Sequence, residues 1–235
     1  GDDPMLMFFT SGTTSYPKIT THNYKYPLGH YITAKYWHQV DPDGIHFAIS
    51  DTGWGKALWG KLYGQWICEA PIFTYDFDDF DAKKILQMIE KYKITTFCAP
   101  PTAYRVMVQN VTTAGEALNP KIYEKFKEKT GFDIMEGFGQ TETTMLIGNI
   151  KGMTPRPGSM GKPSPLYEVA VMLSDGSIAK TGEEGEIVVK VADGVPNGLF
   201  TGYYNDKEKT DSVWYDGYYH TGDTACMDSD GYLWY

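Results

Sequence analysis

The sequence predicts an α/β fold with two subdomains: a parallel-sheet α/β subdomain over residues 1–152, then a small antiparallel β subdomain, a distorted barrel, over residues 153–235. Two observations predict it. Over residues 80–139, β-branched runs alternate with stretches of helical periodicity, which is typical of parallel β-α-β units. Between Met153 and Pro165, four prolines and two glycines mark a boundary, after which short β-rich runs are separated by turns.

The alternating region of the α/β subdomain opens with a helix, a strand and a second helix. Asp81 is a suitable N-cap, and the apolar side chains after it recur at i, i+3, i+4 and i+7 on one helical stripe. These side chains are Ile85, Met88, Ile89 and Tyr92. The β-branched run Ile94–Ala99 predicts a strand that two prolines stop, and Thr102–Gln109 predicts a short helix.

The same alternation then repeats. The run from Val111 to Ala114 predicts a strand, but the single residue Asn110 before it is shorter than the usual connection of about 2–6 residues. We therefore expect a gap in the chain between Asn110 and Val111. Asn119 and the proline after it supply the N-cap and first turn of the next helix, which Gly131 ends.

A further strand is predicted over Asp133–Met135. Ligands of parallel sheets lie at the carboxyl ends of the strands, so Thr113–Ala117 and Glu136–Glu142 are expected at the binding edge. In the β subdomain a short helix is predicted over Asp206–Ser212, together with strands in the segments EVAVML, GEIVVKVA, GYYHTG and DGYLWY. The chain stops at Tyr235 within a strand-like run, so we expect more sequence to follow.

Composition excludes several classes of function. With 30 acidic and 21 basic side chains the net charge is -9, which repels polyphosphate backbones, so we expect no nucleic-acid partner. The longest apolar run has five residues, far fewer than the roughly 20 that span a bilayer, so we expect no transmembrane segment. Cys68, Cys98 and Cys226 lie far apart, which indicates a reducing compartment, and we expect a cytoplasmic protein.

The loop Thr10–Lys18, TSGTTSYPK, is rich in hydroxyl residues and contains one glycine and one lysine. Backbone N–H groups and hydroxyls of such a loop can converge on phosphate oxygens, and the lysine adds a full positive charge. It is not a Walker loop, because Pro17 precedes Lys18 and Ile19 follows it. By composition alone, an ordinary solvated loop is the commoner interpretation.

Three other segments carry groups of the same chemistry. The segment MEGFGQTETT contains Glu142, whose carboxylate suits Mg²⁺ held together with nucleotide phosphates. Gly115 allows close backbone approach beside Glu116, and Asp223 is suited to accept hydrogen bonds from ribose hydroxyls. Each segment alone is more often a turn than a site.

Taken in order, the segments TSGTTSYPK, TAGEAL, EGFGQTE, PGSMGKP, GEIVV and GYYHTGDTACMDSDGYLWY resemble the AMP-forming acyl-CoA synthetases of the adenylate-forming superfamily. The resemblance covers almost the whole chain. Within that superfamily, Ser50–Trp66 is most similar to the medium-chain acyl-CoA synthetase branch.

The resemblance implies a two-step reaction in which ATP and a carboxylic acid, here a medium-chain fatty acid, give acyl-AMP, and coenzyme A then gives acyl-CoA. It implies that Thr141 donates to the α-phosphate or the acyl carboxylate, that Glu142 holds Mg²⁺ and that Asp223 binds the ribose. The β- and γ-phosphates would be bound by Thr10, Ser11, Gly12, Thr13, Thr14 and Lys18. The adenine would be bordered by Gly115, Glu116 and Ala117. The nucleotide would be lined by Glu136, Gly137, Phe138, Gly139 and Gln140, with Phe138 stacking on the base.

The resemblance also implies what this chain lacks. The family's carboxyl-terminal catalytic domain and the amino-terminal segment of its large domain are absent, so we expect the fragment alone to be nearly inactive. Ser15 stands where the family usually has glycine, which puts the phosphate affinity of the loop in question if that position needs a positive φ.

For the acyl group, Trp54 and Gly55 are candidates for a large wall and a small floor of an apolar slot, with His30 near its mouth. Tryptophans are, however, more often core or interface residues. His220 is expected to orient its loop rather than to transfer protons. The remaining histidines are expected to be surface or structural residues: His22, His38 and His46.

Three alternatives stay open. The first is an adenylation domain that loads a carrier protein, against which Trp54 in its Gly-Trp-Gly setting favours coenzyme A. The second is a non-catalytic module that binds carbohydrate or protein through its 18 tyrosines and six tryptophans. The third is a nucleotide-binding relative that has lost catalysis.

Overall fold

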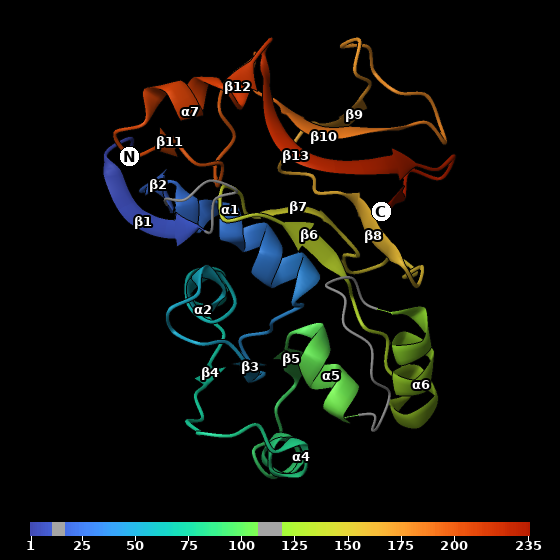
Figure 1. Cartoon of the computed structure of the whole chain (residues 1–235). Coiled ribbons are helices and arrows are strands. Elements are labelled where there is room, and N and C mark those ends of the chain that lie inside the picture. The colour runs from blue at the N-terminus through green and yellow to red at the C-terminus, as the bar shows by residue number, and fades with distance from the viewer. Residues whose placement is uncertain (11–16, 108–118) are drawn as a thin grey trace.

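The computed structural model describes residues 1–10, 17–107 and 119–235. Its strands form three sheets: a three-stranded parallel sheet, an eight-stranded antiparallel sheet and a three-stranded antiparallel sheet that contains the first two strands of the chain. Figure 1 shows the parallel strands among helices in the lower half and the antiparallel strands in the upper half. The predicted α/β class, with a parallel sheet followed by an antiparallel one, is confirmed.

The parallel sheet has the order β4-β3-β5, with β3 (His46–Ala48) between β4 (Ile72–Phe73) and β5 (Thr96–Cys98). In sequence, α4 (Ala82–Lys91) lies between β4 and β5, and α5 (Pro101–Met107) and α6 (Pro120–Thr130) follow β5. The predicted caps are confirmed. The Asp81 carboxylate accepts from the backbone N–H groups of Lys83 and Lys84, the Asn119 side chain accepts from the backbone N–H of Lys121, and Gly131 ends α6 at φ 73°.

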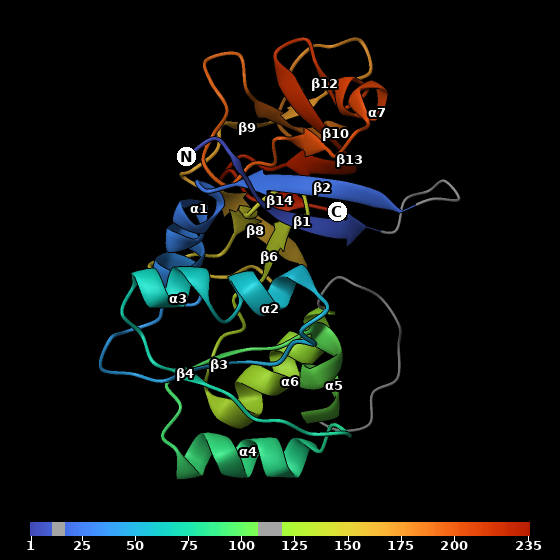
Figure 2. The same cartoon turned by 90° about the vertical axis from the view of Figure 1, so that its left-hand side faces the viewer.

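The first third of the chain adds a hairpin and a set of short helices. Strands β1 (Pro4–Thr10) and β2 (Lys18–Asn23) pair antiparallel, and β2 also pairs with β11 (Gly202–Tyr203). Figure 2 shows this hairpin crossing the middle of the molecule, between the antiparallel strands and the short helices. The helices are α1 (Tyr26–Ile32), a π-helix (Thr33–Trp37), α2 (Gly55–Trp59) and α3 (Tyr63–Ile67).

The large antiparallel sheet has the order β6-β7-β8-β14-β13-β10-β9, and β12 pairs with β13. Its strands are β6 (Gly137–Gly139), β7 (Met145–Gly148), β8 (Ser159–Pro163), β9 (Val169–Met172), β10 (Glu184–Lys190), β12 (Trp214–Tyr215), β13 (Tyr218–Met227) and β14 (Leu233–Trp234). The four strand segments predicted after residue 165 are confirmed, and so is the helix, as α7 (Lys207–Asp211) with Asp206 as its N-cap.

A single core lies against this sheet and joins the two predicted subdomains. Its fully buried members include Leu146 and Ile147 of β7, Ile187 of β10 and Leu233 of β14. Because β6 and β7 precede residue 153, the α/β subdomain contributes strands to the sheet that fills the β subdomain.

The predicted strand over Asp133–Met135 is wrong. This segment has no strand, and the next strand, β6, runs antiparallel to β7, so residues 136–142 do not follow a parallel strand. Side-chain contacts hold this segment instead, and one of them uses the Met135 carbonyl that a ladder would need. The Asp133 carboxylate pairs with the Lys127 ammonium at 2.8 Å, and the Trp37 indole N–H donates to the Met135 carbonyl at 2.7 Å. The predicted strand from Val111 to Ala114 and the predicted gap before it lie outside the described residues.

Candidate functional site

The β1–β2 hairpin places Lys18 at the edge of the candidate site. Thr10 and Lys18 are register partners, so both lie at the same end of the hairpin. The Lys18 ammonium lies 5.2 Å from the centroid of the Tyr203 ring, a cation–π distance. Four predicted phosphate-binding residues of the Thr10–Lys18 loop, and its unusual serine at position 15, lie outside the described residues: Ser11, Gly12, Thr13 and Thr14.

Tyr203 connects Lys18 to the predicted metal ligand. Its hydroxyl donates to Glu142 Oε1 at 2.8 Å, and the Glu142 residue is 9% exposed. Burial, and after it the negative charge of Glu142, raises the pKa of Tyr203, so the phenol keeps its proton and remains a donor. The backbone carbonyl of Glu142 also accepts from the backbone N–H of Phe200 at 2.7 Å, which fixes the turn between β6 and β7.

Gln140 connects the same turn to Asp223. Its amide nitrogen donates to Asp223 Oδ2 at 2.5 Å and to the Thr221 carbonyl at 2.9 Å, and its amide oxygen accepts from the Tyr219 hydroxyl at 2.7 Å. Burial raises the pKa of Tyr219, so this phenol also stays protonated. Gln140 was predicted to line the nucleotide; in the structure both ends of its amide bind protein groups, and it orients Asp223.

Thr141 is held by a histidine from β2. His22 Nε2 lies 2.7 Å from the Thr141 carbonyl oxygen, and the His22 residue is completely buried. Burial lowers the pKa of His22 from 6.5 to about 4, so the neutral imidazole donates through Nε2–H. We expected His22 to be surface or structural; it is structural, and its contact with Thr141 spans 119 residues of sequence, for which no local signal exists.

The glycines on either side of Phe138 are needed for packing. A Cβ at Gly137 would lie 2.7 Å from Trp37 Cζ2, and one at Gly139 would lie 2.6 Å from the Thr144 carbonyl oxygen. Phe138 packs against the core of the antiparallel sheet. The backbone carbonyl of Glu136, the first residue of this predicted nucleotide-lining segment, accepts from the backbone N–H of Asn149 at 2.9 Å. The predicted adenine-bordering residues lie outside the described ranges of the chain: Gly115, Glu116 and Ala117.

Two of the three acyl-site candidates contact one aromatic cluster. This cluster consists of Phe8, His22, Tyr26, His30 and Tyr63. The His30 ring meets the Tyr26 ring edge-on at 4.5 Å, and a Cβ at Gly55 would lie 3.6 Å from the Phe8 ring. His30 is 1% exposed, and burial lowers its pKa from 6.5 to about 3, whereas Trp54 is 71% exposed. The structure therefore places His30 and Gly55 beside the same aromatic cluster and Trp54 at the surface.

Comparisons with known proteins show the family of this chain. A family model described as AMP-binding enzyme matches residues 1–204. The chain belongs to the AMP-binding enzyme family. The human protein named acyl-coenzyme A synthetase ACSM3, mitochondrial, is 43% identical over 244 residues, which cover 98% of this chain and 42% of the relative. The chain thus spans less than half the length of the curated relatives it matches.

Solved structures of this family have the same fold. The crystal structure of Brucella canis acyl-CoA synthetase superposes with a TM-score of 0.87 at 30% identity, covering 99% of this chain and 45% of that one. The crystal structure of ATP-bound MatB from Rhodopseudomonas palustris gives a TM-score of 0.86 at 25% identity, covering 99% and 47%.

The expectation of a cytoplasmic protein is overturned by these relatives. ACSM3 is described as mitochondrial in human, orangutan, rat and mouse. Widely spaced cysteines indicate a reducing environment, which does not by itself distinguish one reducing compartment from another. A transit peptide carries the mitochondrial address, and the residues that build this fold do not encode it. Among the described residues no helix is long and apolar enough to cross a membrane.

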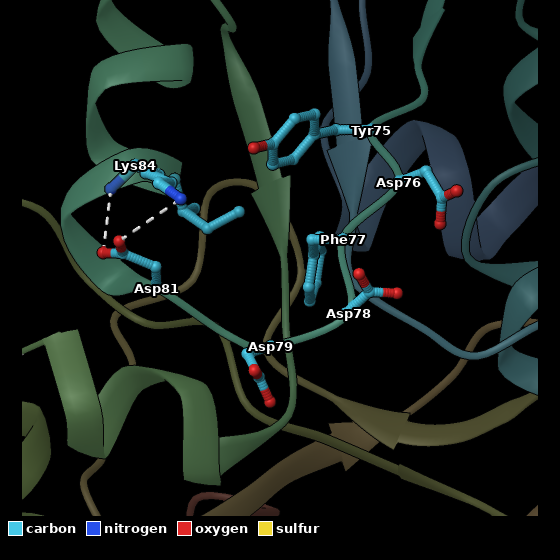
Figure 3. A pocket seen from close by; sticks show the side chains of 8 residues that line it. Tyr75, Asp76, Phe77, Asp78, Asp79, Asp81 and Lys84 are labelled. Atoms are coloured by element: carbon cyan, nitrogen blue, oxygen red, sulfur yellow. Dashed lines mark hydrogen bonds and ion pairs between the residues drawn. The ribbon is translucent and has the colours of Figure 1, made fainter.

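A separate cavity of about 390 Å³ lies between the loop after β4 and the first turn of α4. Figure 3 shows Asp76, Asp78 and Asp79 on that loop, and Lys84 of α4 facing Asp81, the N-cap of this helix. The lining of the cavity contains none of the residues predicted for the nucleotide or acyl site. Its surplus of carboxylates would repel phosphate, so this hollow is unsuited to ATP.

Proposed function

We propose that the full-length protein containing this chain activates a carboxylic acid with ATP and transfers the acyl group to coenzyme A. The carboxylate oxygen attacks the α-phosphorus, which gives acyl-AMP and releases pyrophosphate. The thiol sulfur of coenzyme A then attacks the acyl carbonyl, which gives acyl-CoA and releases AMP. The proposal draws on the name of ACSM3 and on the ATP-bound MatB structure.

The observation that carries the proposal is a continuous set of contacts among distant segments. Lys18 lies over Tyr203, Tyr203 donates to Glu142, and two residues before Glu142 the Gln140 amide donates to Asp223. These groups come from β2, β11, the β6–β7 turn and β13. A cation and two carboxylates therefore lie along one connected set of residues, which supports a shared site in which Lys18 suits the phosphates, Glu142 suits Mg²⁺ and Asp223 suits the ribose.

Each group has a role that follows from its chemistry. Lys18 and Thr10, with the loop between them, bind the β- and γ-phosphates, and Thr141 donates to the α-phosphate or to the acyl carboxylate. Asp223 accepts from the ribose hydroxyls. His22 acts through the Thr141 carbonyl, because its hydrogen bond fixes the backbone from which the Thr141 hydroxyl projects. The adenine is bordered by residues 115–117.

Glu142 fits Mg²⁺. Among the described residues no group of three or more His, Cys, Asp or Glu side chains could hold a metal ion. Mg²⁺ in nucleotide sites is commonly bound through one or two carboxylates together with substrate phosphates, and this requires no preformed cage. The Tyr203 hydroxyl occupies Glu142 Oε1 and so holds the carboxylate in place. When bound, Mg²⁺ would neutralise phosphate charge as the carboxylate approaches.

The acyl group belongs next to the aromatic cluster around His30. The cluster is aromatic, and His30 is buried and remains neutral there, so it can border a hydrocarbon chain without introducing a charge. Gly55 supplies a floor without a side chain, and we assign Trp54 to the wall on the side of the slot that faces solvent in this chain. We propose medium-chain acids as substrates and the mitochondrion as the location.

ATP–pyrophosphate exchange by the full-length protein, with a panel of carboxylic acids, tests the proposal. Exchange that depends on a fatty acid, followed by thioester formation when coenzyme A is added, is the expected result. Transfer of the acyl group to a carrier protein but not to coenzyme A would show that the second step is wrong. Absence of acid-dependent exchange would refute the whole proposal. The 235-residue chain alone is expected to be nearly inactive in the same assay.

A further inference from the structure

Strand β13 carries an irregularity at the point where it delivers Asp223 to the site. In the β10–β13 ladder Glu186 pairs with Thr224, and the next pair is Val188 with His220. Between these two pairs β10 contributes only Ile187, whereas β13 contributes Thr221, Gly222 and Asp223, which leave the ladder as a bulge. Bulges of this kind redirect side chains and are frequent beside active sites.

The Glu186 carboxylate holds this bulge with both of its oxygens. Oε1 accepts from the backbone N–H of Gly222 at 2.8 Å, and Oε2 pairs with His220 Nδ1 at 2.9 Å. Gly222 has a φ of 77°, in the left-handed region that glycine adopts without strain. Glu186 therefore fixes the residue before Asp223, where the chain turns.

His220, the second partner of the Glu186 carboxylate, is held in place by packing. The His220 side chain is 7% exposed, and its ring stacks on the Tyr215 ring with centroids 3.7 Å apart and planes 7° from parallel. On the same bulge the Thr221 hydroxyl donates to the Ile187 carbonyl at 2.7 Å. Glu186 thus connects a fixed histidine to a bulge that ends in an exposed residue, Asp223.

We propose that Glu186 is a positioning residue for nucleotide binding: it holds the Thr221–Asp223 bulge so that the Asp223 carboxylate faces the ribose of ATP. This inference rests on the proposed function, in which Asp223 binds the ribose hydroxyls. Glu186 itself does not touch the nucleotide. It acts through the Gly222 peptide from one side, while the Gln140 amide holds the Asp223 carboxylate from the other.

The test compares ATP with 2′-deoxyATP and 3′-deoxyATP in the full-length protein, because only a ribose contact distinguishes these nucleotides. Four variants are measured: Glu186→Ala, Glu186→Gln, Asp223→Ala and, as a control, Glu184→Ala. Glu184 is an exposed carboxylate two residues away on the same strand. The readout is the KM for ATP and the ratio of kcat/KM between ATP and each deoxynucleotide.

Glu186→Ala is expected to release the bulge, so that the Asp223 carboxylate loses its charge-assisted hydrogen bond to the ribose. The loss of one such bond should raise the KM for ATP about tenfold and reduce the preference for ATP over the deoxynucleotides by a similar factor. Glu186→Gln keeps an acceptor for Gly222 but loses the charge, so it should show a smaller reduction of about threefold. Glu184→Ala should match the wild type.

A wild-type nucleotide preference in Glu186→Ala would overturn the inference, and so would a lower kcat with that preference unchanged. If Glu186→Ala does not fold, as judged by thermal unfolding, Glu186→Gln decides the matter, and an unchanged preference there overturns the inference. If Asp223→Ala loses the preference and both Glu186 variants keep it, Glu186 has no role in positioning the nucleotide, whereas the role of Asp223 stands. If the wild type uses ATP and both deoxynucleotides equally well, Asp223 makes no contact with the ribose hydroxyls, and the inference about Glu186 is then also wrong.

Discussion

Replacing His22 by glutamine is expected to reduce the acid sensitivity of the fold. His22 is completely buried, and burial lowers its pKa from 6.5 to about 4. In the unfolded chain the imidazole takes up a proton as the pH falls below about 6.5, whereas in the folded chain it stays neutral until about pH 4. The stability that this neutral histidine contributes is therefore present above pH 6.5 and is lost as the pH falls to 4.

The size of the effect follows from the two pKa values. Their difference corresponds to about 3 kcal/mol in the free energy of unfolding, lost at about 1.4 kcal/mol per pH unit. Glutamine does not titrate, and its amide nitrogen can donate to the Thr141 carbonyl in place of Nε2–H. The variant should therefore lose this component of the pH dependence while keeping the contact with Thr141.

The assay is urea unfolding of the full-length protein and of His22→Gln at several pH values between 7.5 and 4. Carboxylates and the other buried histidines titrate in both proteins, so the difference between the two curves isolates His22. We expect the variant to be the less stable protein at pH 7.5, because the site is packed around an imidazole, and the difference to shrink as the pH falls. Parallel curves between pH 6.5 and 4 would refute the reasoning.

Three further substitutions test the site. Lys18→Ala should raise the KM for ATP in pyrophosphate exchange by roughly tenfold or more without lowering the melting temperature, since it removes a phosphate partner, and an unchanged KM would exclude Lys18 from the site. Tyr203→Phe leaves the buried Glu142 carboxylate without its donor and should cost about 2 kcal/mol in urea unfolding, whereas a cost below about 0.5 kcal/mol would contradict the Tyr203–Glu142 bond. Trp54→Ala should leave stability within about 0.5 kcal/mol because the side chain is 71% exposed, and it should shift activity towards longer acids; an unchanged chain-length profile would remove Trp54 from the acyl site.

Local chemistry made several elements predictable. Asp81 at the start of α4, and Asn119 and Gly131 at the two ends of α6, act through side chains and backbone groups within a few residues, so the sequence contains the whole signal. The β-branched runs that form β9 and β10 are of the same kind, because their apolar side chains are buried against a core.

Long-range contacts explain what could not be predicted. The backbone of Met135 was expected in a strand, but its carbonyl accepts from Trp37, 98 residues away. The short helices between Tyr26 and Ile67 were not predicted; they are rich in glycine and aromatic residues and lack side-chain N-caps. Their positions depend on packing against one another.

The site also contains residues that the sequence could indicate and residues that only the structure shows. The resemblance pointed to Lys18, Glu142 and Asp223. In the structure Tyr203 connects Lys18 to Glu142, and Asp223 is bound by Gln140, two residues before Glu142. The residues that make these connections, Tyr203 and Gln140 among them, do so through pairings set by the sheets. Glu186 faces Gly222 only because β13 bulges opposite Ile187, and nothing local in the sequence indicates that register.

A structure of the full-length protein with bound ATP tests the central claim most directly. The account predicts that one nucleotide touches Lys18 at its terminal phosphates, Thr141 at its α-phosphate and Asp223 at its ribose hydroxyls. ATP bound at a place that leaves two of these three side chains without a contact to it would contradict the account.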